Sequence, residues 1–244
     1  AVKTPGVTRI EGAASEPEMA DLAEFLKKMG ARIGGMCTHS LRVEGVRRLA
    51  GASHTLIPDR IEAGTYMIAA AITGGELELK GARPDHLGAV IDLIEAAGVS
   101  VGALRGGLRV SGAGRRRVVD LATHPYPGFP TDLQAQMIAL LTLCPGISVV
   151  TEKVFPERFL HVPELNRMAA RISIEGSSAI IKGVRGLSGA PVMASDLRAS
   201  AALVLAGLVA RGETVVDRVY HLDRGYENLE GKLRKVGALI ERVG

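Results

Sequence analysis

The chain has 244 residues, of which 47% are hydrophobic and 23% charged, and this balance is typical of one large or two modest globular domains. No apolar run approaches the roughly 18 residues that a membrane-spanning helix needs. The first residues also lack a signal-peptide core, so the sequence excludes an integral membrane protein and predicts a cytoplasmic one.

The basic character of the chain, with a net charge of +4 and a pI near 9.2, raises the question of nucleic-acid binding. The basic residues are dispersed, and the one cluster, at 115–117, falls in a predicted loop. Only 3% of the residues are aromatic, so few side chains could stack on bases. We therefore expect a small anionic ligand and no nucleic-acid partner.

The first element predicted is one incomplete repeat unit at the N-terminus. It has a strand at 7–10, a helix capped near Ser15 with Pro17 in its first turn, and strands at 32–33 and 41–43. A junction follows at 46–53. We expect residues 1–50 to belong to one domain and residues 51–244 to another.

Three fuller units follow, each opened by an acidic residue and an apolar helix that ends at a glycine turn. Each then has a short strand, an amphipathic helix and one or two further strands. The first helices are rich in alanine and aliphatic residues and are expected to be buried. The openings are Asp59, Asp132 and Asp196, the second helices start near Leu87, Leu165 and Leu229, and the last strands begin near Gly98, Ala169 and Gly237.

The third unit is shorter than the other two. Units one and two finish with strands at 108–110 and 179–181, whereas the third ends at 240–244 before an equivalent strand. An unpaired sheet edge is an aggregation liability. We expect a segment N-terminal to residue 1 to supply the closing strand.

The starts of the three apolar helices are candidate anion sites, because free backbone N–H groups and the helix dipole meet there. Asp59 and Asp196 are interpreted as N-caps. Asp132 follows the proline-rich stretch 124–131, which holds the backbone rigidly before the helix. A carboxylate in that setting could accept a proton from a substrate hydroxyl.

Arginines could supply the positive half of such a site. Arg158 and Arg224 occupy equivalent loops of their repeats, and Arg198 lies one turn into the third apolar helix. Guanidinium groups suit carboxylates and phosphates. The alternative is that Arg158 and Arg224 form surface salt bridges with Glu157 and Asp223, and the spacing favours neither possibility.

The two cysteines show no metal-ligand spacing, and no metal site is expected. Cys144 ends an apolar stretch and is expected to be a buried, inert thiol. Cys37 lies in a polar turn and is given no role.

Several long motifs stand in consistent order along the chain, at 59–65, 129–136, 157–165, 187–190, 196–200 and 223–227. Together they resemble the UDP-N-acetylglucosamine 1-carboxyvinyltransferases, in the enolpyruvyl-transferase family. The resemblance covers essentially the whole chain.

The resemblance implies an α/β enolpyruvyl-transferase fold, an inside-out α/β barrel of repeated βαβαββ units, with the active site between two domains. It implies transfer of the enolpyruvyl group of phosphoenolpyruvate to the 3-hydroxyl of UDP-N-acetylglucosamine, the committed step of peptidoglycan synthesis, with no cofactor. Residues 1–50 would be the last unit of an otherwise absent domain. Residues 51–244 would be a three-unit catalytic domain that lacks its closing N-terminal strand.

The family's site residues carry over only where motifs match. Asp132 matches the carboxylate that contacts the sugar hydroxyl and is the candidate general base, and Val154 matches a backbone contact to UDP-N-acetylglucosamine. Arg224 matches a catalytic basic residue, while Arg158 and Arg198 match the substrate-binding arginines less directly. The family's N-terminal part, with its cysteine-bearing loop, has no counterpart. The chain alone is therefore expected to be inactive without that segment as a partner.

Two other functions remain open at this stage. One is a transferase resembling 5-enolpyruvylshikimate-3-phosphate synthase, although the stretches 129–136 and 223–227 resemble the sugar-nucleotide enzyme more closely. The other is a non-catalytic α/β module that binds a ligand or RNA. Binding of the candidate ligands would separate them.

Overall fold

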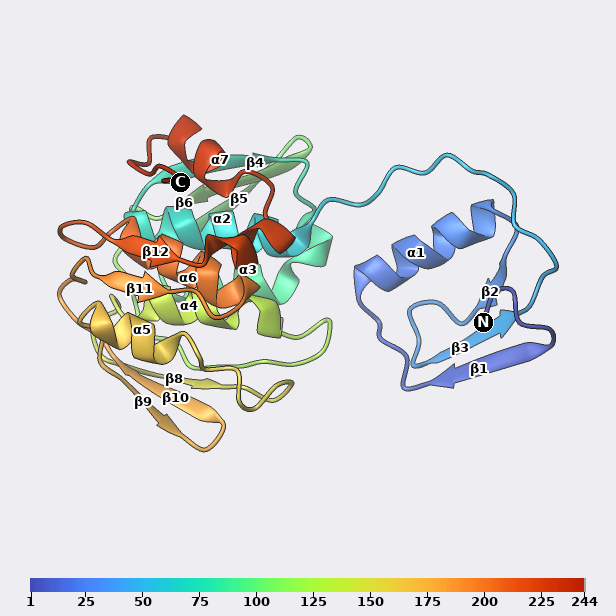
Figure 1. The fold of residues 1–244 in the computed structure, drawn as a ribbon, viewed down its shortest axis with the longest axis horizontal. Coiled ribbons are helices and arrows are strands. Elements are labelled where there is room, and N and C mark those ends of the chain that lie inside the picture. The colour runs from blue at the N-terminus through green and yellow to red at the C-terminus, as the bar shows by residue number, and fades with distance from the viewer. Residues whose placement is uncertain (244) are drawn as a thin grey trace. The chain divides into compact units, whose positions relative to one another are not determined.

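The computed structural model describes residues 1–243, which fall into two compact units. The smaller unit comprises residues 1–58 with 125–128, and the larger comprises 59–124 with the chain from 129 onward. Figure 1 shows the fold with its elements labelled.

The smaller unit is one helix against a three-stranded antiparallel sheet of order β1-β3-β2. The helix begins near Ser15 as expected, with Glu16 at the N-cap position, but no side chain caps it, and the Ser15 hydroxyl donates to the Tyr126 carbonyl at 3.0 Å. Pro17 opens the helix, as the sequence predicts, because its fixed φ suits a first helical position. The elements are β1 (Val7–Glu11), α1 (Pro17–Lys28), β2 (Arg32–Gly34) and β3 (Ser40–Glu44).

The segment after β3 is attached to α1 rather than left free. The Ala50 N–H donates to the Met29 carbonyl at 2.8 Å, and His54 Nε2 lies 2.9 Å from Asp21 Oδ1. The His54 ring also stacks on Phe25, with 5.2 Å between ring centroids. These contacts fix the course of the chain along the helix up to residue 54.

The larger unit is built on a strand, helix, strand, helix, strand, strand pattern, which its middle repeat, residues 121–182, shows in full. Its strands form sheets of order β4-β6-β5, β7-β8-β10-β9 and β11-β12. The elements are α2 (Arg60–Thr73), β4 (Glu76–Lys80), α3 (Gly88–Ala96), β5 (Ser100–Leu104), β6 (Gly107–Ser111), β7 (Leu121–Ala122), α4 (Gln134–Leu141), β8 (Ile147–Thr151), α5 (Val162–Arg167), β9 (Ile172–Glu175), β10 (Ser178–Lys182), β11 (Pro191–Met193), α6 (Leu197–Gly207), β12 (Val215–Asp217) and α7 (Leu229–Lys235). Short 3-10 helices are η1 (Pro84–His86), η2 (Thr131–Leu133) and η3 (Val219–Arg224).

The third sheet differs most from the sequence expectation. The strand expected to start near Gly237 does not form in the part that the structure describes, where residues 236–243 carry no strand. The third sheet has only the parallel pair β11 and β12. A strand needs a hydrogen-bonding neighbour, and in the other two sheets the equivalent strands pair with each other.

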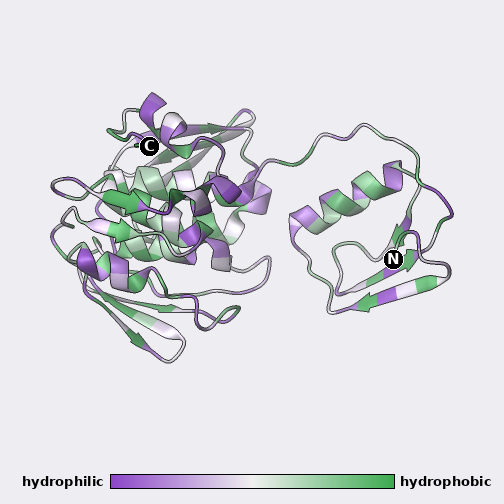
Figure 2. Ribbon diagram, viewed as in Figure 1, coloured by the Kyte–Doolittle hydropathy of each residue, from purple (hydrophilic) through white to green (hydrophobic). Residues whose placement is uncertain are grey.

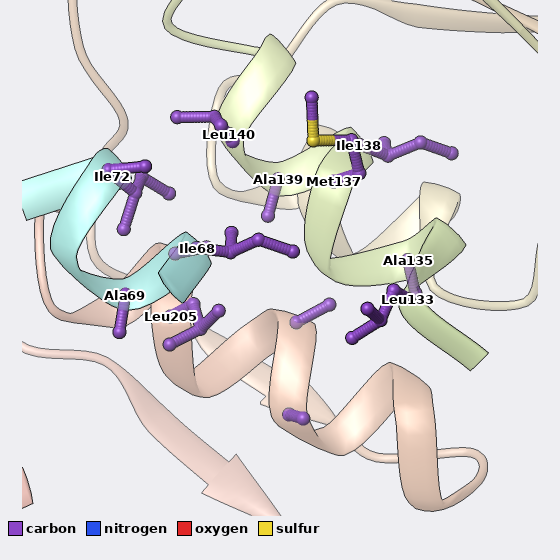
Figure 3. Close-up of a cluster of buried hydrophobic side chains, with 14 of the residues drawn as sticks. Ile68, Ala69, Ile72, Leu133, Ala135, Met137, Ile138, Ala139, Leu140 and Leu205 are labelled. Atoms are coloured by element: carbon purple, nitrogen blue, oxygen red, sulfur yellow. The ribbon is translucent and has the colours of Figure 1, made fainter. Parts of the chain in front are cut away.

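The core of the larger unit is built by α2, α4 and α6, which lie between the sheets in Figure 1. Every residue of α4 is buried, and so are most residues of α2 and α6. The same helices are largely apolar in Figure 2. Figure 3 shows side chains of all three helices, among them Ile68, Ala139 and Leu205, in the region where the helices pack. Buried alanines keep these helices close together.

The three helices begin differently. The Asp59 side chain accepts the Ile61 and Glu62 N–H groups, and Asp196 accepts those of Arg198 and Ala199, so the N-cap interpretation of both is confirmed. The helix α4 has no such side-chain cap. Its approach, η2, contains Asp132, whose side chain is thereby free for other partners.

A close approach between α2 and η2 fixes the position of η2, which leads into α4. A Cβ added at Gly64 would lie 2.4 Å from Leu133 Cδ1, and Leu133 is fully buried. Any larger residue at position 64 would therefore push against the residue that follows Asp132. The glycine in the middle of α2 is explained by this contact.

Candidate functional site

Asp132 is the centre of the site and is held by two arginines from different repeats. Its Oδ1 accepts Arg158 Nη1 at 2.7 Å, and its Oδ2 accepts Arg198 Nη2 at 2.8 Å. Arg158 lies in the loop after β8, and Arg198 is in the first turn of α6. Charge-assisted bonds to both carboxylate oxygens fix its orientation. The structure thus brings together three of the residues that the sequence singled out.

The charges around Asp132 determine its ionisation. Burial raises the pKa of the Asp132 carboxyl, but the Arg198 and Arg158 guanidinium groups outweigh it, and the net pKa lies below the ordinary value. Burial lowers the pKa of Arg198, and its contacts with Tyr226 and Asp132 more than reverse this. At neutral pH the site therefore contains an aspartate anion between two cations.

A buried hydroxyl links the three inner helices beside this ion pair. The Tyr226 hydroxyl lies 2.8 Å from Thr65 Oγ1 of α2, 3.2 Å from Gln136 Nε2 of α4 and 3.3 Å from Arg198 Nη1 of α6. The Thr65 hydroxyl donates to the Ile61 carbonyl, so Tyr226 is the donor to Thr65 and the acceptor for the other two. The N-terminal halves of the helices therefore converge on one point.

We expect Tyr226→Phe to lower the free energy of unfolding by about 1–2 kcal/mol, because Arg198 Nη1 loses its acceptor and the buried Thr65 hydroxyl loses a donor. The matched control is Tyr220→Phe, since Tyr220 is 58% exposed, and its effect should stay within about 0.5 kcal/mol. Urea unfolding followed by circular dichroism measures both. Equal effects of the two substitutions would contradict a role for the Tyr226 hydroxyl.

Val154 lies in a turn that a buried carboxylate organises. Glu152, at 0% exposure, accepts the Val154 N–H at 2.8 Å and the Phe155 N–H at 3.0 Å. The turn leads into the loop that carries Arg158. The turn that Glu152 organises therefore fixes the position of Val154 and the start of the Arg158 loop.

A cavity of about 600 Å³ opens beside Arg158, one of the two arginines that pair with Asp132. Its lining includes Phe155, Glu157, Arg158 and Asp196. The guanidinium of Arg158 lies 5.6 Å from the Phe155 ring centroid, and Phe155 is 57% exposed. The lining thus offers one guanidinium group beside the carboxylates of Glu157 and Asp196.

Arg224 lies apart from these contacts at the end of η3. It is exposed, and within residues 1–243 no ion pair is formed between it and Asp223, which instead pairs with Arg242 at 2.6 Å. Likewise Arg158 pairs with Asp132 rather than Glu157. The surface salt bridges considered as the alternative are therefore wrong for both arginines, and a substrate role for Arg224 stays a prediction.

Cys144 takes no part in these contacts. Cys144 is fully buried, and burial raises the pKa of its thiol to about 11, so it is inert as expected. Among residues 1–243 no group of three His, Cys, Asp or Glu side chains is placed to hold a metal ion. Nor does any helix of that part have the length and apolarity to cross a membrane.

Sequence reasoning missed Glu152, Thr131 and Gln136 as parts of the site. Glu152 had one signal, since it is an acid directly after an apolar strand. For Thr131 and Gln136 the only indication in the sequence was that they lie close to Asp132 along the chain. Tyr226 lies within the motif at 223–227, but the sequence does not show that its partner is Thr65, 161 residues away.

The chain matches a known family over most of its length. The family is EPSP synthase (3-phosphoshikimate 1-carboxyvinyltransferase), matched at residues 1–233. The UDP-N-acetylglucosamine 1-carboxyvinyltransferase of Gluconacetobacter diazotrophicus is 62% identical over 98% of the chain and 57% of its own length. The UDP-N-acetylglucosamine 1-carboxyvinyltransferase 1 of Caldanaerobacter subterraneus is 56% identical over 99% of the chain and 58% of its own length.

Solved structures agree with the fold. The enolpyruvyl transferase NikO from Streptomyces tendae matches 97% of the chain and 57% of its own chain, with a TM-score of 0.86 and 27% identity. EPSP synthase from Acinetobacter baumannii matches 98% of the chain and 58% of its own, with a TM-score of 0.72 and 17% identity. The chain thus spans a little over half the length of the relatives it matches.

Proposed function

The chain belongs to the EPSP synthase family of carboxyvinyltransferases, and from this premise we propose that it is part of an enzyme that transfers the enolpyruvyl group of phosphoenolpyruvate to the 3-hydroxyl of UDP-N-acetylglucosamine, with release of phosphate. The observation that carries the proposal is Asp132, held between two guanidinium groups beside a cavity. Relatives named for this activity are 55–62% identical to the chain. The proposed role is in peptidoglycan synthesis in the cytoplasm.

Asp132 has the chemistry of a general base in this proposal. It would accept the proton of the sugar hydroxyl as the new carbon–oxygen bond forms. Its lowered pKa makes it a weak base while both arginines face it. Anionic substrates would compete for Arg158 and Arg198, weaken the ion pairs and raise the pKa of Asp132 toward a useful value. Val154 would contact the sugar nucleotide, and Arg224 would join the site through its loop.

The length of the relatives limits which activity the chain alone can have. It spans about 57% of their length, so we propose the reaction for a protein of their full length. In that protein, residues 1–50 would be the last unit of a domain that is mostly outside this chain. Residues 51–244 would be the three-unit domain, and we expect them to be inactive on their own.

The two-stranded sheet gives a stability prediction for that longer protein. β11 and β12 form only one ladder, and Met193 and Val215 are 44% and 40% exposed. We propose that a strand from an N-terminal segment covers this region, because adding a pairing partner buries backbone and apolar groups. The melting temperature of the larger unit should rise when the segment is added. An unchanged melting curve, or an equal rise with a glycine–serine segment of the same length, would refute the idea.

Calorimetry of the 244-residue chain and of the full-length protein tests the function itself. UDP-N-acetylglucosamine, shikimate 3-phosphate and a short RNA are the three ligands to compare. We expect heat from UDP-N-acetylglucosamine with the full-length protein, and phosphate release when phosphoenolpyruvate is added. Selective binding of shikimate 3-phosphate would support the other transferase, and selective binding of RNA would support a non-catalytic module.

A further inference from the structure

Glu152 is a fully buried carboxylate with a hydrogen-bond partner on both oxygens. Its Oε1 accepts the Thr123 hydroxyl together with the Val154 and Phe155 N–H groups, and its Oε2 accepts the Thr131 hydroxyl at 2.9 Å. A buried anion is strongly disfavoured unless donors surround it. Four donors from three segments of the chain surround this one, so the segments are tied together at Glu152.

The Thr131 hydroxyl extends this arrangement to the ion pair. Its only hydrogen is directed at Glu152, so its oxygen is left as an acceptor, and Arg158 Nη1 donates to it at 3.1 Å. The same Arg158 nitrogen donates to Asp132 Oδ1 at 2.7 Å. A continuous path of hydrogen bonds therefore runs from the buried carboxylate to the candidate base.

The hydrogen bonds from the backbone to Glu152 also position Arg158, through the loop that carries it. By holding the N–H groups of Val154 and Phe155, Glu152 closes the turn from which the Arg158 loop continues. The Lys153 N–H donates to Thr123 Oγ1 at 2.9 Å, which fixes the turn to the neighbouring segment. Backbone and side chain of Arg158 are thus both positioned from one point.

We propose that Glu152 is a positioning residue, whose buried negative charge orients the Thr131 hydroxyl and the 153–155 turn so that Arg158 is held against Asp132. The hydrogen bonds of Glu152 go to Thr123, Thr131, Val154 and Phe155, so it acts on Asp132 only through other residues. Its importance for turnover rests on the proposed function, while its effect on Arg158 and Asp132 does not.

The proposal requires an acceptor-only group at position 152, and Glu152→Gln tests this because it keeps the size and removes the charge. The amide NH₂ introduced by the substitution would face either the two backbone N–H groups or the Thr131 hydroxyl. In the first case the two backbone N–H groups, which are donors, would face the NH₂ group, which is also a donor. In the second the Thr131 hydrogen turns away from residue 152, toward Arg158. Either outcome weakens the hold on Arg158.

The experiment is a carbon-13 NMR titration of the Asp132 carboxyl in the 244-residue chain. In Glu152→Gln we expect the pKa of Asp132 to move up toward that of an ordinary carboxyl, because Arg158 no longer faces it steadily. The matched control is Asp120→Asn: Asp120 also binds a backbone N–H of β8, that of Val149 at 2.7 Å. The control should leave the Asp132 titration unchanged. An unchanged Asp132 titration in folded Glu152→Gln would overturn the proposal.

A second pair of variants covers the case in which Glu152→Gln does not fold. Thr131→Val removes the hydroxyl that joins Glu152 to Arg158, whereas Thr131→Ser keeps it. We expect the pKa of Asp132 to rise in the valine variant and to stay near the wild-type value in the serine variant. Identical titrations in the two variants would overturn the proposal as well.

Kinetics of the full-length protein separate this inference from the proposed function. Glu152→Gln should raise KM for UDP-N-acetylglucosamine about tenfold, the effect of weakening one charged hydrogen bond, and shift the acid limb of kcat/KM to higher pH. If the wild-type protein shows no transferase activity while the NMR titration responds, the proposed function fails and the positioning role stands. If the wild-type protein is active and the Asp132 titration does not change in Glu152→Gln, the positioning role fails and the proposed function stands.

Discussion

Asp132→Ala is expected to lower the turnover of the full-length protein by about 10²-fold or more, within the usual contribution of a general base. The substitution removes the only carboxylate that, among residues 1–243, both Arg158 and Arg198 contact. It also leaves two guanidinium groups to repel each other. Phosphate release from phosphoenolpyruvate, with UDP-N-acetylglucosamine saturating, measures the loss.

Two further substitutions decide what the loss means. Asp132→Asn keeps the size and cannot take the proton, so turnover should fall to a similar extent. Asp85→Ala removes an exposed carboxylate that pairs with Arg83 at the surface, and turnover should not change. Near-wild-type turnover of Asp132→Asn would remove Asp132 from the role of base.

The ion pairs of Asp132 also set the sign of a pH effect on stability. Its folded-state pKa is depressed, so the ion pairs stabilise the fold above the ordinary carboxyl pKa. That stabilisation is lost as the pH falls through the folded value. The wild-type chain should therefore lose more stability on acidification than Asp132→Asn does.

Leu205→Ala is expected to lower the free energy of unfolding of the larger unit by about 2–5 kcal/mol. Leu205 is fully buried, and it meets α2 near Ile68 and Ala69 (Figure 3). The surrounding helices are held close by alanines and cannot easily collapse into the space. Because the chain has no tryptophan, circular dichroism during urea unfolding is the suitable measurement.

The matched control makes the same chemical change at an exposed position. Leu239 is fully exposed, so Leu239→Ala should change the free energy of unfolding by less than about 0.5 kcal/mol. Comparable losses for Leu205 and Leu239 would mean that the three-helix core does not dominate the stability of this unit.

The sequence predicted the elements that have a strong local pattern. The three apolar helices follow from periodicity, and Asp59 and Asp196 follow from capping chemistry. The predicted glycine end is confirmed only for α2, at Gly74, because α4 and α6 have their C-caps at Thr142 and Leu208, before the glycines at 146 and 212. The strands β7 and β11 were missed. They have two and three residues, too few for a pattern, and they form only because β8 and β12 lie parallel beside them.

The partners within the site were harder to predict than its members. Asp132, Arg158 and Arg198 were all identified, but the pairing of Arg158 with Asp132 rather than Glu157 depends on the turn that Glu152 closes. That turn is a tertiary feature, because Thr123 and Thr131 come from other segments to surround the buried charge. Local spacing contains no information on which carboxylate an arginine will face.

The Tyr226 hydroxyl has a consequence for how the site comes into being. Its partners come from three successive repeats, so no repeat can complete the site before the others have docked. We therefore expect ligand binding at this site to be coupled to the docking of the three repeats. A bound ligand should protect the amides of all three inner helices from hydrogen exchange together, including those of α2, which contributes no arginine to the ion pair.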